Sequence, residues 1–179
     1  MTDFNNAIAA YTRAIAANPR YAEAYFYRGN SYYARGRWHR GNRNDLRGAI
    51  ANYSQALKLG YPRRNDVLFN RANARGAVGD YRGALADFNE AIRTDRRPGI
   101  RQFRALAHYF LRNRNAAIAD LQAVANAHYQ SGSTERYQSI MNVIAAIKKG
   151  QNPTNSYPNS ISWAINDFIE GKRTRCPWD

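Results

Sequence analysis

Small and apolar residues recur along the chain at the spacing of an α-helix. Within residues 80–92 they fall at i, i+1, i+4, i+7 and i+8: Ala84, Leu85, Phe88, Ala91 and Ile92. Helix breakers follow such segments, as in Asn18-Pro19, Gly60-Tyr61-Pro62 and Arg97-Pro98-Gly99. Turn and N-cap residues stand between paired helices, as Gly79-Asp80 and Asn44-Asp45. The pattern predicts an all-α chain.

The predicted helices repeat in pairs. Residues 3–15, 45–57, 80–92 and 113–125 align, and their equivalent alanines are Ala7, Ala49, Ala84 and Ala117. A second set at 25–35, 68–78 and 101–111 interleaves with the first. The period near 34 is typical of an α-solenoid of helix pairs. We expect the alanines at helix crossings, with Tyr11, Tyr53 and Phe88 filling the grooves between helices.

The repeated residues resemble the tetratricopeptide repeat (TPR), in its bacterial variety with RGN and GDY motifs. One unit matches at Arg28-Gly29-Asn30, Tyr32, Ala49, Tyr53, Ala56 and Pro62. The next matches at Arg71-Ala72-Asn73, Gly79-Asp80-Tyr81, Ala84, Phe88 and Ala91. The fourth unit departs from the motif at Arg114 and Leu121, where aromatic residues are usual. The resemblance covers residues 3–125 and implies an α-solenoid of TPR helix-turn-helix repeats.

We expect a TPR array over residues 1–149: a half-repeat at 3–18, repeats at 21–62, 64–96 and 98–130, and an extra helix at 134–149. A polar linker (150–160), an amphipathic helix (161–171) and a basic tail (172–179) follow. The helix at 161–171 is predicted to cap the array, and the alternative is that it occupies the groove. The first unit lacks its leading helix, so the chain either starts with a half-repeat or is a piece of a longer protein.

Charge and composition narrow the function. Lys and Arg number 27 against 13 Asp and Glu, and the net charge of +14 favours anionic partners. No apolar run reaches membrane-spanning length, and no signal peptide is recognisable, which favours a cytoplasmic location. The single Cys176 and three scattered histidines predict no metal site or other cofactor.

No catalytic motif is found in the sequence, neither a Gly-rich phosphate loop nor a nucleophile motif. Asp87 and Asp120 each follow an arginine, Arg71 or Arg104, by sixteen residues, which predicts an ion pair between the two helices of a unit. Arg28 has Asn52 in the equivalent place, so a different partner is expected for it. The chain is therefore predicted to be a binding module and not an enzyme.

The TPR resemblance implies a concave groove lined by the first helix of each unit. The predicted peptide-binding residues are Phe26, Asn30, Tyr33, Phe69, Asn70, Asn73, Gln102 and Tyr109. Aromatic rings would cover the side chains of an extended peptide, and amides would bind its backbone. The alternative is that Phe26, Phe69 and Tyr109 pack between adjacent units.

Some TPR proteins clamp the C-terminal carboxylate of chaperones with two asparagines and three basic residues. Asn30 and Asn70 match the asparagines, but Phe26, Gly99 and Phe103 stand where the basic residues are needed. Binding of a chaperone tail is therefore not predicted.

An insertion of about eight residues lies between Tyr33 and Ala49, relative to a standard unit. It contains the predicted anion-binding residues Arg35, Arg37, Arg40 and Arg43 around Trp38. The alternative is an extended helix end with a solvated loop. We predict a protein-interaction scaffold that binds a peptide or protein segment of acidic character, and the alternative is binding of RNA or DNA through the arginine-rich surface.

Overall fold

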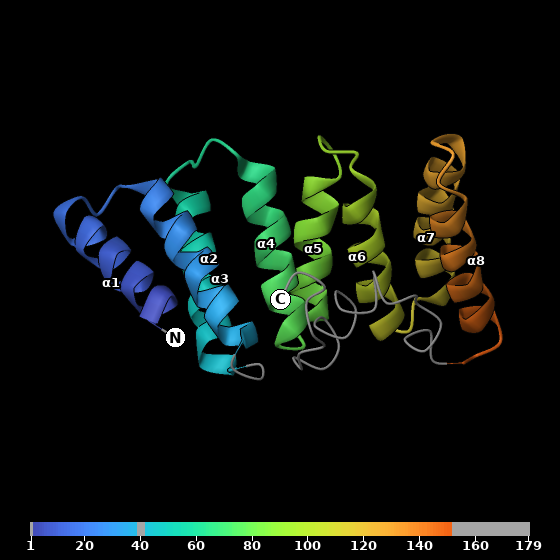
Figure 1. Ribbon diagram of the computed structural model, residues 1–179, viewed down its shortest axis with the longest axis horizontal. Coiled ribbons are helices and arrows are strands. Elements are labelled where there is room, and N and C mark those ends of the chain that lie inside the picture. Colours follow the sequence, from blue (N-terminus) through green and yellow to red (C-terminus); the bar gives the residue numbers. More distant parts are fainter. Residues whose placement is uncertain (1, 39–41, 152–179) are drawn as a thin grey trace.

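The computed structural model describes residues 2–38 and 42–151, which form eight helices and no strand. The helices are α1 (Thr2–Ala17), α2 (Ala22–Trp38), α3 (Arg43–Lys58), α4 (Arg64–Ala77), α5 (Tyr81–Ala91), α6 (Pro98–Phe110), α7 (Arg114–Gln130) and α8 (Thr134–Lys148). They stand side by side in chain order, each antiparallel to the next (Figure 1). The prediction of an all-α helical-repeat solenoid is confirmed. The predicted capping helix at 161–171 and the basic tail at 172–179 lie outside the described residues.

The helix contacts show which side of the array is concave. Each helix packs on its neighbour in the chain, and in addition α2 contacts α4 and α4 contacts α6. These three are the first helices of their units, while α3, α5 and α7 are the second helices. Because first helices approach the next first helix more closely than second helices approach one another, they lie on the inner side of the curve.

Small residues make the helix crossings close. Ala49, Ala84 and Ala117, the repeat-equivalent alanines of the second helices, are completely buried. Beside them, Tyr53 of α3 and Phe88 of α5 are also completely buried. The predicted places of these alanines and aromatic residues are thereby confirmed. Two core clusters result, one centred on Tyr53 and one running from Phe88 to α8, and they meet at α4.

Enlarging a crossing alanine is expected to destabilise the fold. Ala84→Leu should lower the free energy of unfolding by about 1 to 3 kcal/mol, because the close-packed crossing has no room for a larger side chain. Ala86→Leu is the matched control, since Ala86 lies in the same helix and is exposed. Urea denaturation of both variants measures the difference, and equal stabilities would contradict the assigned repeat phase.

Three arginines of the first helices bind the second helix of their own unit. Arg71 donates to both carboxylate oxygens of Asp87 at 2.9 and 2.7 Å, and Arg104 donates to both of Asp120 at 2.7 and 2.5 Å. Both ion pairs confirm the prediction. Arg28 donates to the Asn52 side-chain oxygen at 2.8 Å. The expectation of a different partner for Arg28 was wrong, because an amide oxygen accepts this hydrogen bond as a carboxylate does.

The same three arginines also bind the second helix of the preceding unit. Arg28 reaches Thr12, Arg71 reaches Ser54 and Arg104 reaches Asn89, with donor–acceptor distances of 3.1, 3.0 and 2.9 Å. Thr12, Ser54 and Asn89 occupy equivalent positions of successive repeats. We call this recurring set of contacts the arginine ladder, and it ties each unit to the one before it.

The loops divide between two rims because successive helices are antiparallel. The loops between units (α1–α2, α3–α4 and α5–α6) lie along one rim, at the top in Figure 1, and we call it the inter-unit rim. The turns within units lie along the opposite rim. The turn between α4 and α5 is tight: Gly79 has φ +86°, and Asp80 caps α5 by accepting from the Gly83 amide at 2.9 Å.

The turn before α3 differs from the prediction. Asn42, not Asp45, is the N-cap residue, and its side chain accepts from the amides of Asn44 and Asp45. Asp45 is buried and bound to Arg35 of α2. The longer α2 brings Arg35 within reach of this carboxylate, which changes the role that Asp45 would have in a standard unit.

Candidate functional site

The predicted groove residues come from α2, α4 and α6, and we call the inner surface of these helices the first-helix face. Phe26, Asn30 and Tyr33 are spaced along one side of α2 at i, i+4 and i+7. Phe69, Asn70 and Asn73 come from α4, and Gln102 and Tyr109 from α6. The structure brings some of these side chains together and buries others in the core.

Asn30 and Asn70 meet between α2 and α4. The Asn30 side-chain oxygen accepts from the Asn70 amide at 3.1 Å and from the Tyr53 hydroxyl at 2.9 Å. Burial raises the pKa of the Tyr53 hydroxyl well above its ordinary value, so this group remains a donor at neutral pH. The side-chain nitrogen of Asn30 and the side-chain oxygen of Asn70 have no hydrogen-bond partner within the described chain.

Phe26 does not lie where repeat phase predicted it. Its side chain is 5% exposed and stacks on the ring of Tyr61, with ring centroids 4.6 Å apart. Tyr61 comes from the loop between α3 and α4, so Phe26 packs between adjacent units. The prediction that Phe26 binds peptide is corrected, because the Tyr61 ring of the loop already covers its ring.

Asn73 is also buried, at 8% exposure, and its side-chain oxygen has no hydrogen-bond partner. A comparison of the units explains why. The two donors to Asn30 are Tyr53 and Asn70, and the repeat-equivalent residues around Asn73 are Phe88 and Phe103. Neither phenylalanine has a polar group to donate. Asn73 is therefore the repeat equivalent of Asn30, but it lacks the two hydrogen-bond donors that Asn30 has in the preceding unit.

The remaining predicted residues are half-buried: Tyr33, Phe69, Gln102 and Tyr109. Phe69 packs edge-on against Phe103, with ring centroids 5.5 Å apart, and thereby joins α4 to α6. Tyr33 lies under the Arg37 guanidinium, 5.3 Å from the ring centroid, and its hydroxyl accepts from Arg37 at 3.3 Å. The first-helix face therefore presents aromatic rings and amides.

The predicted anion-binding residues are largely occupied by contacts within the chain. Arg35 donates to both carboxylate oxygens of Asp45 at 2.8 and 2.5 Å, and this bond raises the pKa of its guanidinium. Arg43 donates to the Val78 carbonyl at 2.7 Å. Arg37 binds Tyr33, and Arg40 lies outside the described residues. Arg35 is therefore neutralised within the chain, and its place in the predicted anion-binding surface is corrected, whereas Arg43 is exposed and keeps its charge.

Sequence reasoning missed the hydrogen bond between Tyr53 and Asn30. The sequence does contain a signal for it, because only one of the two equivalent aromatic residues has a hydroxyl. Tyr53 can donate to Asn30, whereas Phe88 at the equivalent position has no donor for Asn73.

Exchanging this hydroxyl between the units is expected to shift stability in opposite directions. Tyr53→Phe should lower the free energy of unfolding by about 1 kcal/mol, because Asn30 loses a buried donor. Phe88→Tyr should raise it by up to about 1 kcal/mol by giving Asn73 a donor. Chemical denaturation measures both. A loss of stability in both variants would contradict the equivalence of the two sites.

The described residues contain no group of three or more His, Cys, Asp or Glu that could hold a metal ion. Within the same part of the chain, no helix combines the length and the apolar character needed to cross a membrane.

Comparison with known protein families agrees with the repeat architecture. A family model described as TPR repeat matches residues 3–36, and one described as Tetratricopeptide repeat matches residues 38–99. A comparison with curated proteins gives no match to the chain. The two family matches, the stacked helix pairs and the buried repeat alanines agree, and the chain belongs to the tetratricopeptide repeat family.

Proposed function

We propose that this protein is a non-enzymatic interaction scaffold that binds a peptide or protein segment on its first-helix face. TPR repeats are generally protein–protein interaction modules, which supports a scaffold role. The single observation that carries the proposal is unused hydrogen-bonding capacity on one surface. The Asn30 amide nitrogen and the Asn70 amide oxygen have no partners within the described chain.

The half-buried rings and amides of this face suit an extended segment. Amides offer both donors and acceptors to a peptide backbone, and Phe69 and Tyr109 offer apolar area to its side chains. The net charge of +14 favours a partner of acidic character. The groove residues themselves are uncharged, so their own contacts should depend only weakly on salt.

The test uses a peptide selected from a random display library against the full chain. Tyr109→Ala should weaken binding of that peptide by about 2 kcal/mol, or about thirty-fold in Kd, if the ring is an anchor. Gln102→Ala is compared with Gln55→Ala, since both glutamines are half-buried and only Gln102 belongs to the first-helix face. Fluorescence anisotropy of the labelled peptide gives each Kd.

Loss of binding in Tyr109→Ala and Gln102→Ala, with Gln55→Ala unchanged, supports the proposal. Equal affinities in all three variants overturn it. Nucleic acid is the competing class of partner, and single-stranded RNA serves as its probe. Binding of RNA that falls steeply between about 50 and 200 mM salt and is indifferent to Tyr109 would favour that class.

A further inference from the structure

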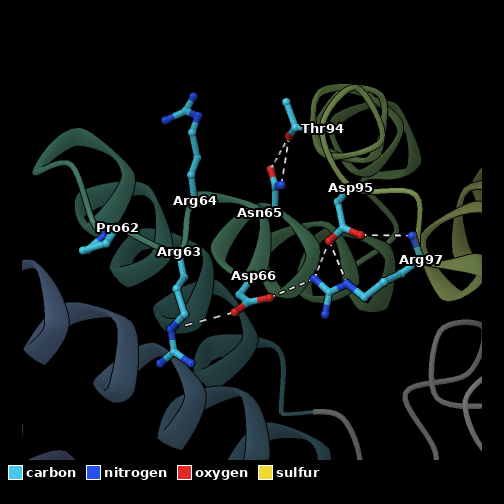
Figure 2. A pocket seen from close by; sticks show the side chains of 8 residues that line it. All are labelled: Pro62, Arg63, Arg64, Asn65, Asp66, Thr94, Asp95 and Arg97. Atoms are coloured by element: carbon cyan, nitrogen blue, oxygen red, sulfur yellow. Dashed lines mark hydrogen bonds and ion pairs between the residues drawn. The ribbon is translucent and has the colours of Figure 1, made fainter.

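A second candidate binding surface runs along the inter-unit rim, away from the first-helix face. One pocket of about 330 Å³ is lined by Tyr21, Ala22 and Glu23 and by Tyr61, Pro62 and Arg63. A pocket of about 390 Å³ continues it, between residues 62–66 on one side and Thr94, Asp95 and Arg97 on the other (Figure 2). The pockets are adjacent, because Pro62 and Arg63 line both of them, and we call the two together the rim trough.

Two contacts join the walls of the second pocket. Two consecutive residues of α4 bind the segment that joins α5 to α6, Asn65 with Thr94 and Asp66 with Arg97, and beside them Arg64 binds Glu90 of α5. The Asn65 amide donates to Thr94 at 2.9 Å, and Arg97 donates to Asp66 at 2.9 Å, as Figure 2 shows. The trough is therefore formed before any ligand binds, which lowers the entropic cost of binding.

The first pocket ends in an apolar wall. Its Tyr61 ring stacks on Phe26, and its hydroxyl accepts from Arg63 at 2.9 Å, so the ring is fixed on both sides. Tyr21 lines the same pocket and is 44% exposed, and Pro62 borders both pockets. Rings and a proline around a small pocket suit one aromatic or aliphatic side chain.

The charge of this rim is positive. Asp66 and Asp95 are both bound to Arg97, and the hydrogen bonds from Arg97 lower the pKa of Asp95. Glu90 is likewise bound to Arg64. Arg20, Arg93 and Arg96 belong to the same loops, are exposed, and have no side-chain partner within the described chain. These three charges are available to an anionic ligand.

We propose that the rim trough binds an acidic peptide segment that carries one aromatic or large aliphatic side chain. The side chain enters the pocket between Tyr21 and Tyr61, and the acidic residues on either side of it pair with Arg20, Arg93 and Arg96. A peptide fits the trough better than a nucleic acid does. The Glu23 carboxylate lines the first pocket and can accept from a peptide N–H group, which a phosphate cannot donate.

The probe is a short fluorescein-labelled peptide of aspartate and glutamate with one central phenylalanine, titrated with the full chain at low salt. The triple variant Arg20→Ser, Arg93→Ser and Arg96→Ser should weaken binding about tenfold. Its matched control is Arg13→Ser, Arg82→Ser and Arg136→Ser, which removes the same charge from exposed arginines of α1, α5 and α8 that have no side-chain hydrogen-bond or ion-pair partner. The control should keep the affinity of the unmodified chain within about twofold.

Tyr21→Ala tests the apolar anchor. It should weaken binding of the phenylalanine peptide and leave unchanged the binding of a peptide with alanine in place of phenylalanine.

Equal losses of affinity in the two triple arginine variants would overturn the site, since they indicate diffuse electrostatic attraction. Single-stranded RNA that displaces the peptide at equal charge concentration would overturn the assignment to peptides. Gln102→Ala should have no effect here, so failure at the rim is distinguishable from failure of the first-helix face.

Discussion

Asp87→Ala is expected to lower the free energy of unfolding by about 3 to 5 kcal/mol. The Asp87 carboxylate is 3% exposed and neutralises two arginines, Arg71 at 2.7 Å and Arg75 at 2.9 Å. Its removal leaves the largely buried Arg71 guanidinium without a counter-charge and leaves Arg75 with only the more distant Asp80 carboxylate at 3.7 Å, so the cost of desolvating Arg71 is no longer offset. It also removes the acceptor through which Arg71 holds α4 to α5.

An exposed ion pair of the same two helices is the control. Arg64 and Glu90 also join α4 to α5, but both side chains are about half exposed. Glu90→Ala should therefore cost no more than about 1 kcal/mol. Urea denaturation monitored by circular dichroism compares the variants, and a similar small loss in both would show that burial does not strengthen the ion pair between α4 and α5.

Phe88→Ala is expected to lower the free energy of unfolding by about 3 to 5 kcal/mol. The ring is completely buried, and it packs against Phe69 of α4 and Phe103 of α6. Truncation leaves a cavity at the point where three helices of two units meet. Since the two sides of this cavity belong to different units, the loss should fall on their interface as well as on α5 itself.

Phe88→Leu separates the loss of volume from other effects, because leucine fills part of the cavity and should recover part of the lost stability. Tyr21→Ala is the exposed aromatic control and should change the free energy of unfolding by less than about 0.5 kcal/mol. If Phe88→Ala is as stable as the unmodified chain, the ring does not contribute to the packing of α4, α5 and α6 as described.

The repeat architecture could be predicted because small residues recur wherever two helices cross. Ala84 and its equivalents are determined by close packing, and packing repeats with the sequence. The ion pairs of Arg71 and Arg104 could be predicted for the same reason: a constant separation of sixteen residues spans the same turn in both units.

The candidate site was less predictable, because it depends on residues that do not repeat. The repeat alignment places Phe26 among the groove residues, but Tyr61 of the irregular loop between α3 and α4 covers its ring. Arg35 was expected at a free surface, and the lengthened α2 places it on Asp45 instead. The unsatisfied amide of Asn73 was open to prediction, since it follows from comparing Tyr53 with Phe88.

The two rims of the array differ in how freely their loops can change length. On the inter-unit rim, the contacts of Asn65 and Asp66 hold α4 to the loop that leads into α6 of the next unit. On the opposite rim, the chain already accommodates a longer connection between α2 and α3 while α3 keeps its completely buried Ala49 and Tyr53. For protein engineering, the within-unit turns are therefore the places to insert an affinity tag or a fluorophore without disturbing the stacking of the repeats.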